Sequence, residues 1–308
     1  MLSKRRSLID EVLKDLKLLK EQSIFNNEYA LDENIGFFTS IKSLPSYLLW
    51  LFKKARNIKR EKLLELSDLP FTKWDEEMHL KLIEMQRKPF PGLIKPIVSK
   101  ITDFILKNAQ KDLLLLNLGS GAMEIERQVI YHLKEKHTNR VVFIGIDKSV
   151  AVKKLARDNF SRSTEFVEIH EIEHLNQKKL DEILEQNTGK YVVLLCKNDI
   201  FRLLQDFNPQ KFDLIYHSLF KHHLNNQEKD IVDEVIKQLT TRSIEYDGYK
   251  SWPVMIPQSI TTWKYPVLLN ATIFSDLRYY TKKELKQKYN NRPSFFNIGT
   301  YMLENGKI

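Results

Sequence analysis

The sequence predicts an α/β fold, in which a doubly wound sheet follows an all-helical N-terminal region. Through roughly the first 110 residues apolar side chains recur at helical spacing, as in 8–19. Beyond Lys111 the pattern changes to short β-rich runs that alternate with helices. Runs such as 113–116 and 192–195 are apolar without a break, which is typical of parallel strands covered by helices on both faces.

The individual elements follow from periodicity and from turn residues. N-terminal helices are predicted at 8–19, 48–66, 75–87 and 97–107. Strands are predicted at 113–118, 141–147, 191–196, 212–217 and 243–246, with a C-terminal pair near 295–298 and 301–303. Helices between them are predicted at 124–136, 150–159, 227–239 and 282–289, and 161–190 is a connection or an insertion. We expect two regions, a helical 1–110 and a sheet domain 111–308.

Composition limits the class of protein. A chain of 308 residues that is 42% hydrophobic and 29% charged can bury a core, which excludes disorder for most of its length. The single cysteine, Cys196, excludes a disulfide framework and a thiolate zinc cluster, and it fits a reducing, cytoplasmic location. Apolar runs of about six residues fall short of the roughly 20 that span a bilayer, so we expect a soluble protein.

The net charge of +9 is spread along the chain, with one dense basic stretch at 53–62 directly after the apolar segment 47–52. Such a segment can contact an anionic membrane surface or nucleic acid. A packed helix with a solvated polar face is the interpretation we favour, because charge runs are usually solvated. Peripheral membrane contact stays open, and the oligomeric state cannot be inferred.

A glycine turn follows the first strand of the sheet domain. Only 9 glycines occur in the chain, and two of them, Gly119 and Gly121, are two positions apart. Glycines in such a turn let the backbone approach a ligand, and the following helix offers free N–H groups. A second strand ends in Asp147 roughly two dozen residues later, near the spacing at which an acid binds the ribose hydroxyls of a nucleoside.

Residue 124 decides between classes of nucleoside cofactor. A dinucleotide site has a third glycine or an alanine there, so that pyrophosphate can lie on the helix N-terminus. Glu124 places a carboxylate at that position, which argues against NAD or FAD. A cofactor without phosphate and with a cationic amino-acid end tolerates the acid, and S-adenosyl-L-methionine is such a cofactor.

Four landmarks in order resemble the class I S-adenosylmethionine-dependent methyltransferase family. They are the strand and turn at 116–121, the strand-end Asp147, the segment 197–200, and the run from 212 to His222-His223-Leu224. The resemblance covers about 111–308 and implies a Rossmann-like sheet that binds S-adenosyl-L-methionine.

The resemblance also implies roles for individual residues. Gly119, Ser120 and Gly121 would hold the methionine part, Asp147 the ribose, and Asp199 with Ile200 the adenine, with Lys148 flanking it. Asn117 stands where the family usually has an acid and can still accept a hydrogen bond, and Met123 stands where a third glycine is common.

Three histidines follow or end the fourth predicted strand, at the edge where open α/β sheets bind ligands. We name His222 and His217 as candidate general bases, because an unperturbed imidazole titrates near pH 6.5. A packing role is the competing interpretation, and methyl transfer depends more on alignment than on a base.

The segment 170–174 spells H-E-x-x-H, which on a helix would pair two imidazoles for a zinc hydrolase. Glu173 within it favours a solvated, charged insertion instead. A catalytically degenerate binding module that uses the basic helical region is the other alternative.

The acceptor cannot be identified from the sequence. Tyr216-His217-Ser218-Leu219 stands where nucleobase N-methylation would have an Asn-Pro-Pro-Tyr type signature, so we expect a small-molecule acceptor and no nucleic acid partner.

Overall fold

The structure of the protein is a computed structural model that describes residues 92–133, 139–147, 149–161, 167–251, 278–290, 292–296 and 299–306. The predicted helices before residue 92 and the basic stretch 53–62 lie outside these residues. The chain divides into two compact units. Unit 1 comprises Met1–Trp74, Lys221–Ile231 and Gly248–Glu284, and unit 2 comprises Asp75–Phe220, Val232–Asp247 and Leu285–Ile308.

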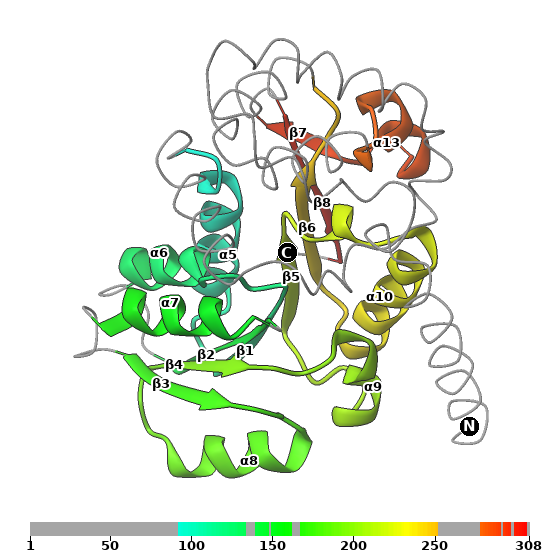
Figure 1. The fold of residues 1–308 in the computed structure, drawn as a ribbon. Helices are drawn as coiled ribbons and strands as arrows, with labels where there is room; N and C mark the ends of the chain where they lie inside the picture. Colours follow the sequence, from blue (N-terminus) through cyan, green and yellow to red (C-terminus); the bar gives the residue numbers. More distant parts are fainter. Residues whose placement is uncertain are drawn as a thin grey trace, which may run out of the picture. The chain divides into compact units, whose positions relative to one another are not determined.

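One sheet organises the described part of unit 2. Its order is β3-β4-β2-β1-β5-β6-β8-β7 (Figure 1). The strands are β1 (Leu113–Leu118), β2 (Val141–Ile146), β3 (Val167–Ile172), β4 (Tyr191–Cys196), β5 (Leu214–Ser218), β6 (Ser243–Gly248), β7 (Ser294–Phe296) and β8 (Thr300–Asn305). The pairs from β3 to β6 are parallel, and β7 pairs antiparallel with β8. The strand order runs in opposite directions from β1, so the predicted doubly wound, Rossmann-like arrangement is confirmed.

Burial explains why the central strands are so apolar. Every residue of β2 and β4 is buried, and five of the six residues of β1 are buried. Figure 1 shows α6 (Glu124–Leu133) and α7 (Val150–Ser161) on one side of the sheet and α8 (Gln177–Gln186) on the other. A strand that packs against helices on both faces cannot alternate polar and apolar residues.

The remaining helices complete the described chain. They are α5 (Lys95–Lys107), α9 (Leu203–Asp206), α10 (Asn226–Leu239), α13 (Lys282–Lys288), and the 3₁₀ helices η3 (Ile200–Arg202) and η4 (Lys221–His223). In α5 the side chains of Ile97, Ile101 and Phe104 are buried in the same apolar core as β1 and β2. Helical spacing places these three side chains on one face, which explains why α5 packs there. The division at residue 110 stays a prediction.

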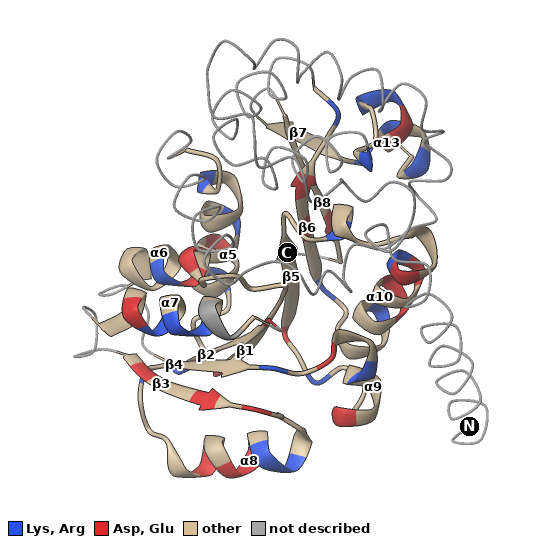
Figure 2. Ribbon diagram, in the orientation of Figure 1, with Lys and Arg blue, Asp and Glu red and all other residues tan. Residues whose placement is uncertain are grey.

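Charges lie on the covering helices. Figure 2 shows both signs along α8 and α10, whereas β1, β2 and β4 carry neither. On α8, Lys178 and Lys179 each lie within ion-pair distance of Glu182, at 3.9 and 3.7 Å. Charges of both signs therefore lie together on these helices. None of its helices is both apolar enough and long enough to traverse a lipid bilayer.

The stretch 161–190 differs from the prediction, because it contributes β3 and α8 to the fold rather than an irregular connection. β3 pairs with β4 and forms the outer strand of the sheet. Its residues alternate between apolar and polar, as in Val167, Glu168, Ile169 and His170, which is the period-2 pattern of a half-exposed edge strand. The charged residues of the H-E-x-x-H segment concealed this alternation.

The same strand removes the basis of the zinc alternative. His170 and Glu171 are consecutive in β3, so their side chains point to opposite faces instead of sharing one turn of a helix. His174 lies beyond the strand end. Within the residues that the structure describes, no group of three or more His, Cys, Asp or Glu side chains is arranged to hold a metal ion.

Candidate functional site

The turn between β1 and α6 depends on two glycines with left-handed backbone conformations. The φ angles are +65° at Gly119 and +54° at Gly121. A Cβ atom on Gly119 would collide with the ring of Phe220, whereas a Cβ atom on Gly121 would meet no heavy atom within 4 Å. Gly119 is therefore required by packing as well as by conformation, and Gly121 leaves open space beside the turn.

Asp147 holds this turn against the end of β2. Its Oδ2 accepts a hydrogen bond from Gly121 N at 3.0 Å, and its Oδ1 accepts one from Ser149 N at 2.9 Å. Ser120 N donates to Ile146 O at 3.0 Å, and Asp147 N donates to Cys196 O at 3.1 Å. Each carboxylate oxygen keeps a second lone pair, so Asp147 can still accept hydrogen bonds from ligand hydroxyls.

Met123, which stands where the family resembled by the sequence commonly has a third glycine, has a left-handed conformation with φ of +51°. The side chain is fully buried, and a Cβ atom on Gly145 of β2 would lie 2.6 Å from Met123 Sδ and 2.8 Å from Ser120 Oγ. The glycine missing from the turn is thus matched by a glycine in the neighbouring strand, which makes room for the methionine.

Glu124 begins α6, where the sequence analysis places a negative charge. Its carboxylate accepts hydrogen bonds from Arg127 Nη2 at 2.5 Å and Gln128 Nε2 at 3.0 Å. The hydrogen bond to Glu124 raises the pKa of Arg127. The charge at the helix start is therefore paired within the helix, and it stays unfavourable for a pyrophosphate at this N-terminus.

A second carboxyl group beside the turn was missed by the sequence analysis. Glu126 is fully buried, and its Oε1 accepts hydrogen bonds from Asn117 Nδ2 and from Tyr216 OH, both at 2.6 Å. Burial raises the pKa of Glu126. The sequence carried a signal for it, because Glu126 stands in the stripe of Val129, Ile130 and Leu133 that α6 turns toward the core.

The predicted adenine segment follows β4. Asp199 caps the 3₁₀ helix η3 by accepting a hydrogen bond from Phe201 N at 3.1 Å, and Asp199 Oδ2 lies 3.9 Å from Arg202 Nε. The Asp199 side chain is 52% exposed, and Ile200 is half-buried. One carboxylate oxygen of Asp199 therefore accepts a backbone hydrogen bond, while the side chain as a whole remains accessible.

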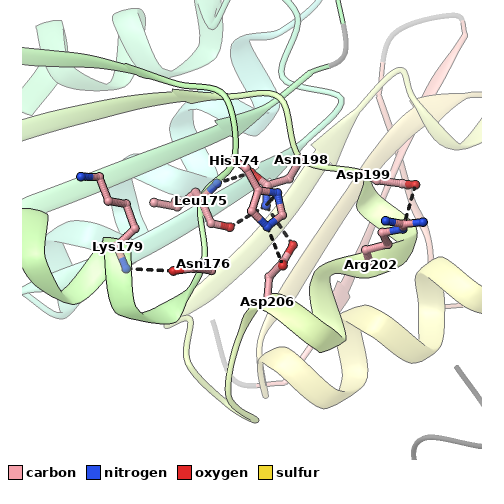
Figure 3. A network of polar contacts seen from close by, with 8 residues as sticks. All are labelled: His174, Leu175, Asn176, Lys179, Asn198, Asp199, Arg202 and Asp206. Atoms are coloured by element: carbon pink, nitrogen blue, oxygen red, sulfur yellow. Dashed lines mark hydrogen bonds and ion pairs between the residues drawn. The ribbon is translucent and has the colours of Figure 1, made fainter.

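Asn198 fixes this segment to the neighbouring strand end (Figure 3). Its Oδ1 accepts from Leu175 N at 2.8 Å, and its Nδ2 donates to Leu175 O at 2.5 Å and to Asp206 Oδ2 at 2.9 Å. The amide side chain imitates one more rung of the parallel β3–β4 ladder, past the last paired residues. Asn198 is buried, which makes these bonds important for the position of Asp199.

His174 lies on the outer side of the same network. Its Nε2 is 2.9 Å from Asp206 Oδ1, and its Nδ1 is 3.5 Å from Asn198 Nδ2. The short contact to Asp206 is satisfied by an Nε2–H donor, and the two amide hydrogens of Asn198 already bond Leu175 O and Asp206 Oδ2. His174, which the zinc alternative would use as a ligand, is instead engaged with Asp206 and Asn198.

His217 lies in β5, directly opposite Leu118 at the end of β1. Its Nε2 is 3.9 Å from Glu245 Oε2, and both side chains are buried. Glu245 also accepts hydrogen bonds from Tyr301 OH and, at 3.3 Å, from Tyr289 OH. Burial, and then the charges of Glu245 and Asp247, raise the pKa of Tyr301 well above its ordinary value.

His222 belongs to η4 in unit 1. Its ring centroid is 3.9 Å from that of His223 and 4.8 Å from that of Tyr279. In the same unit Arg278 NH2 donates to His223 O at 3.2 Å. Lys148 lies outside the described residues, and Cys196 is buried in β4, where burial raises its thiol pKa to about 12.

The structure thus brings together the glycine turn, Asp147 and Asp199. They follow β1, β2 and β4, which are adjacent and parallel and end in register, with Leu118 opposite Ile146 and Ile146 opposite Cys196. The carboxyl ends of parallel strands at a switch point are where open α/β sheets bind ligands.

Solved structures that this chain resembles include methyltransferases. The plantazolicin methyltransferase BpumL in complex with S-adenosylhomocysteine is 11% identical with a TM-score of 0.49, over 84% of this chain and 100% of that one. The plantazolicin methyltransferase BamL, in complex with a triazolic desmethylPZN analogue and S-adenosylhomocysteine, is 17% identical with a TM-score of 0.45, over 80% of this chain and 79% of that one. The CurJ carbon methyltransferase is 11% identical with a TM-score of 0.44, over 86% and 71%. No family model and no curated protein matches the sequence.

The contact between Met123 and Gly145 yields a stability prediction. Gly145→Ala places a methyl group against Met123 Sδ and should lower the free energy of unfolding by about 1–3 kcal/mol, measured by urea denaturation. Gly92→Ala is the control, because its Cβ would meet only Lys95 Cδ at an ordinary 4.0 Å. The double variant Met123→Ala/Gly145→Ala should show coupling between the two sites, and strict additivity would contradict the assignment.

The Asn198 network yields a prediction that separates stability from positioning. Asn198→Ala removes the bonds to Leu175 and should destabilise the fold by about 1–3 kcal/mol, while also weakening binding of 5′-methylthioadenosine in calorimetry. Asn176→Ala, which removes the cap of α8, is the matched control at about 1 kcal/mol. Equal nucleoside affinity in the two variants would show that Asn198 has no role in positioning Asp199.

Proposed function

We propose that the protein is an S-adenosyl-L-methionine-dependent methyltransferase that acts on a small-molecule acceptor. The observation that carries the proposal is the convergence of Gly119–Gly121, Asp147 and Asp199 after three adjacent parallel strands. The order of these groups along the edge of the sheet matches the order of methionine, ribose and adenine in the cofactor.

The residues present fit this cofactor. The open space at Gly121 and the N-terminus of α6 suit the amino-acid part, with Ser120 in the same turn. The free lone pairs of Asp147 suit the two ribose hydroxyls, and the exposed carboxylate of Asp199 suits the adenine amino group, with Ile200 beside it. Lys148 completes the proposed set, whereas Asn117, predicted from the sequence as a cofactor ligand, is buried and donates to Glu126 beside the turn.

Glu124 supports this cofactor over a dinucleotide. A pyrophosphate at the N-terminus of α6 would approach a carboxylate, whereas the cationic end of S-adenosyl-L-methionine would be attracted by it. The pairing with Arg127 reduces this field without removing it.

The cofactor supplies an activated methyl group on a sulfonium, so the chain itself chiefly has to position the reactants. Asp147 and the glycine turn hold the nucleoside and its tail in one orientation, and Asp199 fixes the other end. Such alignment can supply roughly 7–11 kcal/mol of barrier reduction. His217 and His222 are our candidate bases for a proton on the acceptor, and the helical region 1–110 is our candidate for acceptor selection.

The cofactor proposal predicts binding of S-adenosylhomocysteine in isothermal titration calorimetry. Asp147→Ala should weaken this binding by about 1.5–3 kcal/mol, or tenfold or more, because hydrogen bonds to a charged group are lost. Asp103→Ala, an identical change at an exposed position of α5, should leave the affinity unchanged. A wild-type protein that does not bind, or undiminished binding by Asp147→Ala, would falsify the assignment.

The role of the histidines can be tested once the acceptor is found by mass spectrometry of a cell extract incubated with labelled cofactor. A general base contributes about 10²–10⁴ in rate, so replacement of the true base by Asn should lower kcat by that factor without changing the affinity for S-adenosylhomocysteine. A loss of cofactor affinity in parallel with kcat in both His217→Asn and His222→Asn would assign these histidines to packing.

A further inference from the structure

Two hydrogen-bond acceptors beside the glycine turn have no donor. In the described part of the chain, Glu126 Oε2 and Asn117 Oδ1 are buried and have no hydrogen-bond partner. The other polar atom of each side chain is hydrogen-bonded, because Asn117 Nδ2 and Tyr216 OH both donate to Glu126 Oε1. Buried polar atoms in folded proteins are nearly always satisfied, so a pair of adjacent orphans requires an explanation.

One proton accounts for both orphans. A carboxylic acid and a primary amide form a cyclic pair, in which the amide N–H donates to the acid C=O and the acid O–H donates to the amide C=O. The first of these bonds is present at 2.6 Å. A proton on Glu126 Oε2 makes that atom a donor and gives Asn117 Oδ1 its missing partner.

We propose that Glu126 is a neutral carboxylic acid in the folded protein and that its cyclic pair with Asn117 is a positioning device for the glycine turn. Asn117 precedes the turn near the end of β1, and Glu126 follows it in the first turn of α6. The pair thereby connects the residues that precede and follow the turn 118–123, and Tyr216 of β5 donates a further hydrogen bond to Glu126. The role of the pair in cofactor positioning rests on the proposed function. The protonation of Glu126 is independent of that function.

The surroundings favour the neutral form. Among the described residues, the titratable groups that act on Glu126 are Tyr216 from β5 and Glu124 from its own helix. Burial is the main cause that raises the pKa of Glu126, the charge of Glu124 raises it further, and the hydrogen bonds from Tyr216 and Asn117 lower it. Burial raises the pKa of Tyr216 well above its ordinary value, and the contact with Glu126 raises it further.

The proton predicts a pH dependence of stability. Because the pKa of Glu126 in the folded state is raised above its ordinary 4.5, the folded protein keeps a proton that the unfolded chain has lost. Stability from this group therefore falls as pH rises from about 4.5 to the folded-state pKa, by about tenfold in the folding equilibrium constant per pH unit.

The first test compares wild type with Glu126→Gln, whose amide keeps a donor at the same position and does not titrate. The ratio of the wild-type to the variant folding constant, from urea denaturation, should fall as pH rises above about 4.5. The infrared spectrum of wild type minus Glu126→Gln should contain a protonated carboxyl band at neutral pH. Glu185→Gln, an exposed change on α8, should show neither effect. A constant ratio or a carboxylate band would overturn the proposal.

The second test addresses positioning. Asn117→Leu keeps the side-chain size and removes the pair, so it should weaken S-adenosylhomocysteine binding by about tenfold or more. Binding of 5′-methylthioadenosine, which lacks the amino-acid part, should change little, and Glu126→Gln should keep both affinities. Equal loss for both ligands would reduce the pair to a structural role. A wild type that binds neither ligand would refute the proposed function, whereas the infrared and urea measurements would still decide on the proton.

Discussion

The hydrogen bond from Gly121 N to Asp147 Oδ2 is the interaction on which the candidate site depends. It connects the turn after β1 to the end of β2, and Asp147 N continues the connection to Cys196 at the end of β4. Three strand ends are thereby fixed to one another by the carboxylate and backbone of a single residue. Gly121 adopts a left-handed conformation in this arrangement, which a glycine accepts without steric cost.

At two positions the chain departs from the pattern of the family that its sequence resembles, and each departure is accompanied by a contact with another element. Met123 replaces a glycine in the turn, and Gly145 in β2 gives its side chain room. Asn117 replaces an acid in β1, and Glu126 in α6 brings a carboxyl group back to the same place. Both pairs lie close in space and apart in sequence. The geometry of the turn therefore depends on packing between different elements rather than on any single position.

Much of the fold was predictable, because buried parallel strands have an unmistakable apolar pattern. The ranges 113–118 and 191–196 agree with β1 and β4 residue for residue. β3 was missed because its alternating Val-Glu-Ile-His pattern resembles a solvated loop when no neighbouring strand is known. Within the site, the sequence analysis named Gly121, Asp147 and Asp199 as cofactor-binding candidates, which stay predictions, whereas it did not name Asn198, Glu126 or Gly145. Their roles consist of contacts with residues on other elements.

The sequence by itself determined the class of the fold, the edge of the sheet that carries the turn, and the absence of a third glycine from that turn. Periodicity and local backbone requirements are properties of short segments, so they can be predicted from the sequence without tertiary information. The tertiary structure decided how a methionine fits in the turn, where the carboxyl group beside Asn117 comes from, and that the 170–174 segment is a strand end. Each of these depends on distances between side chains from different elements, which only the folded chain fixes.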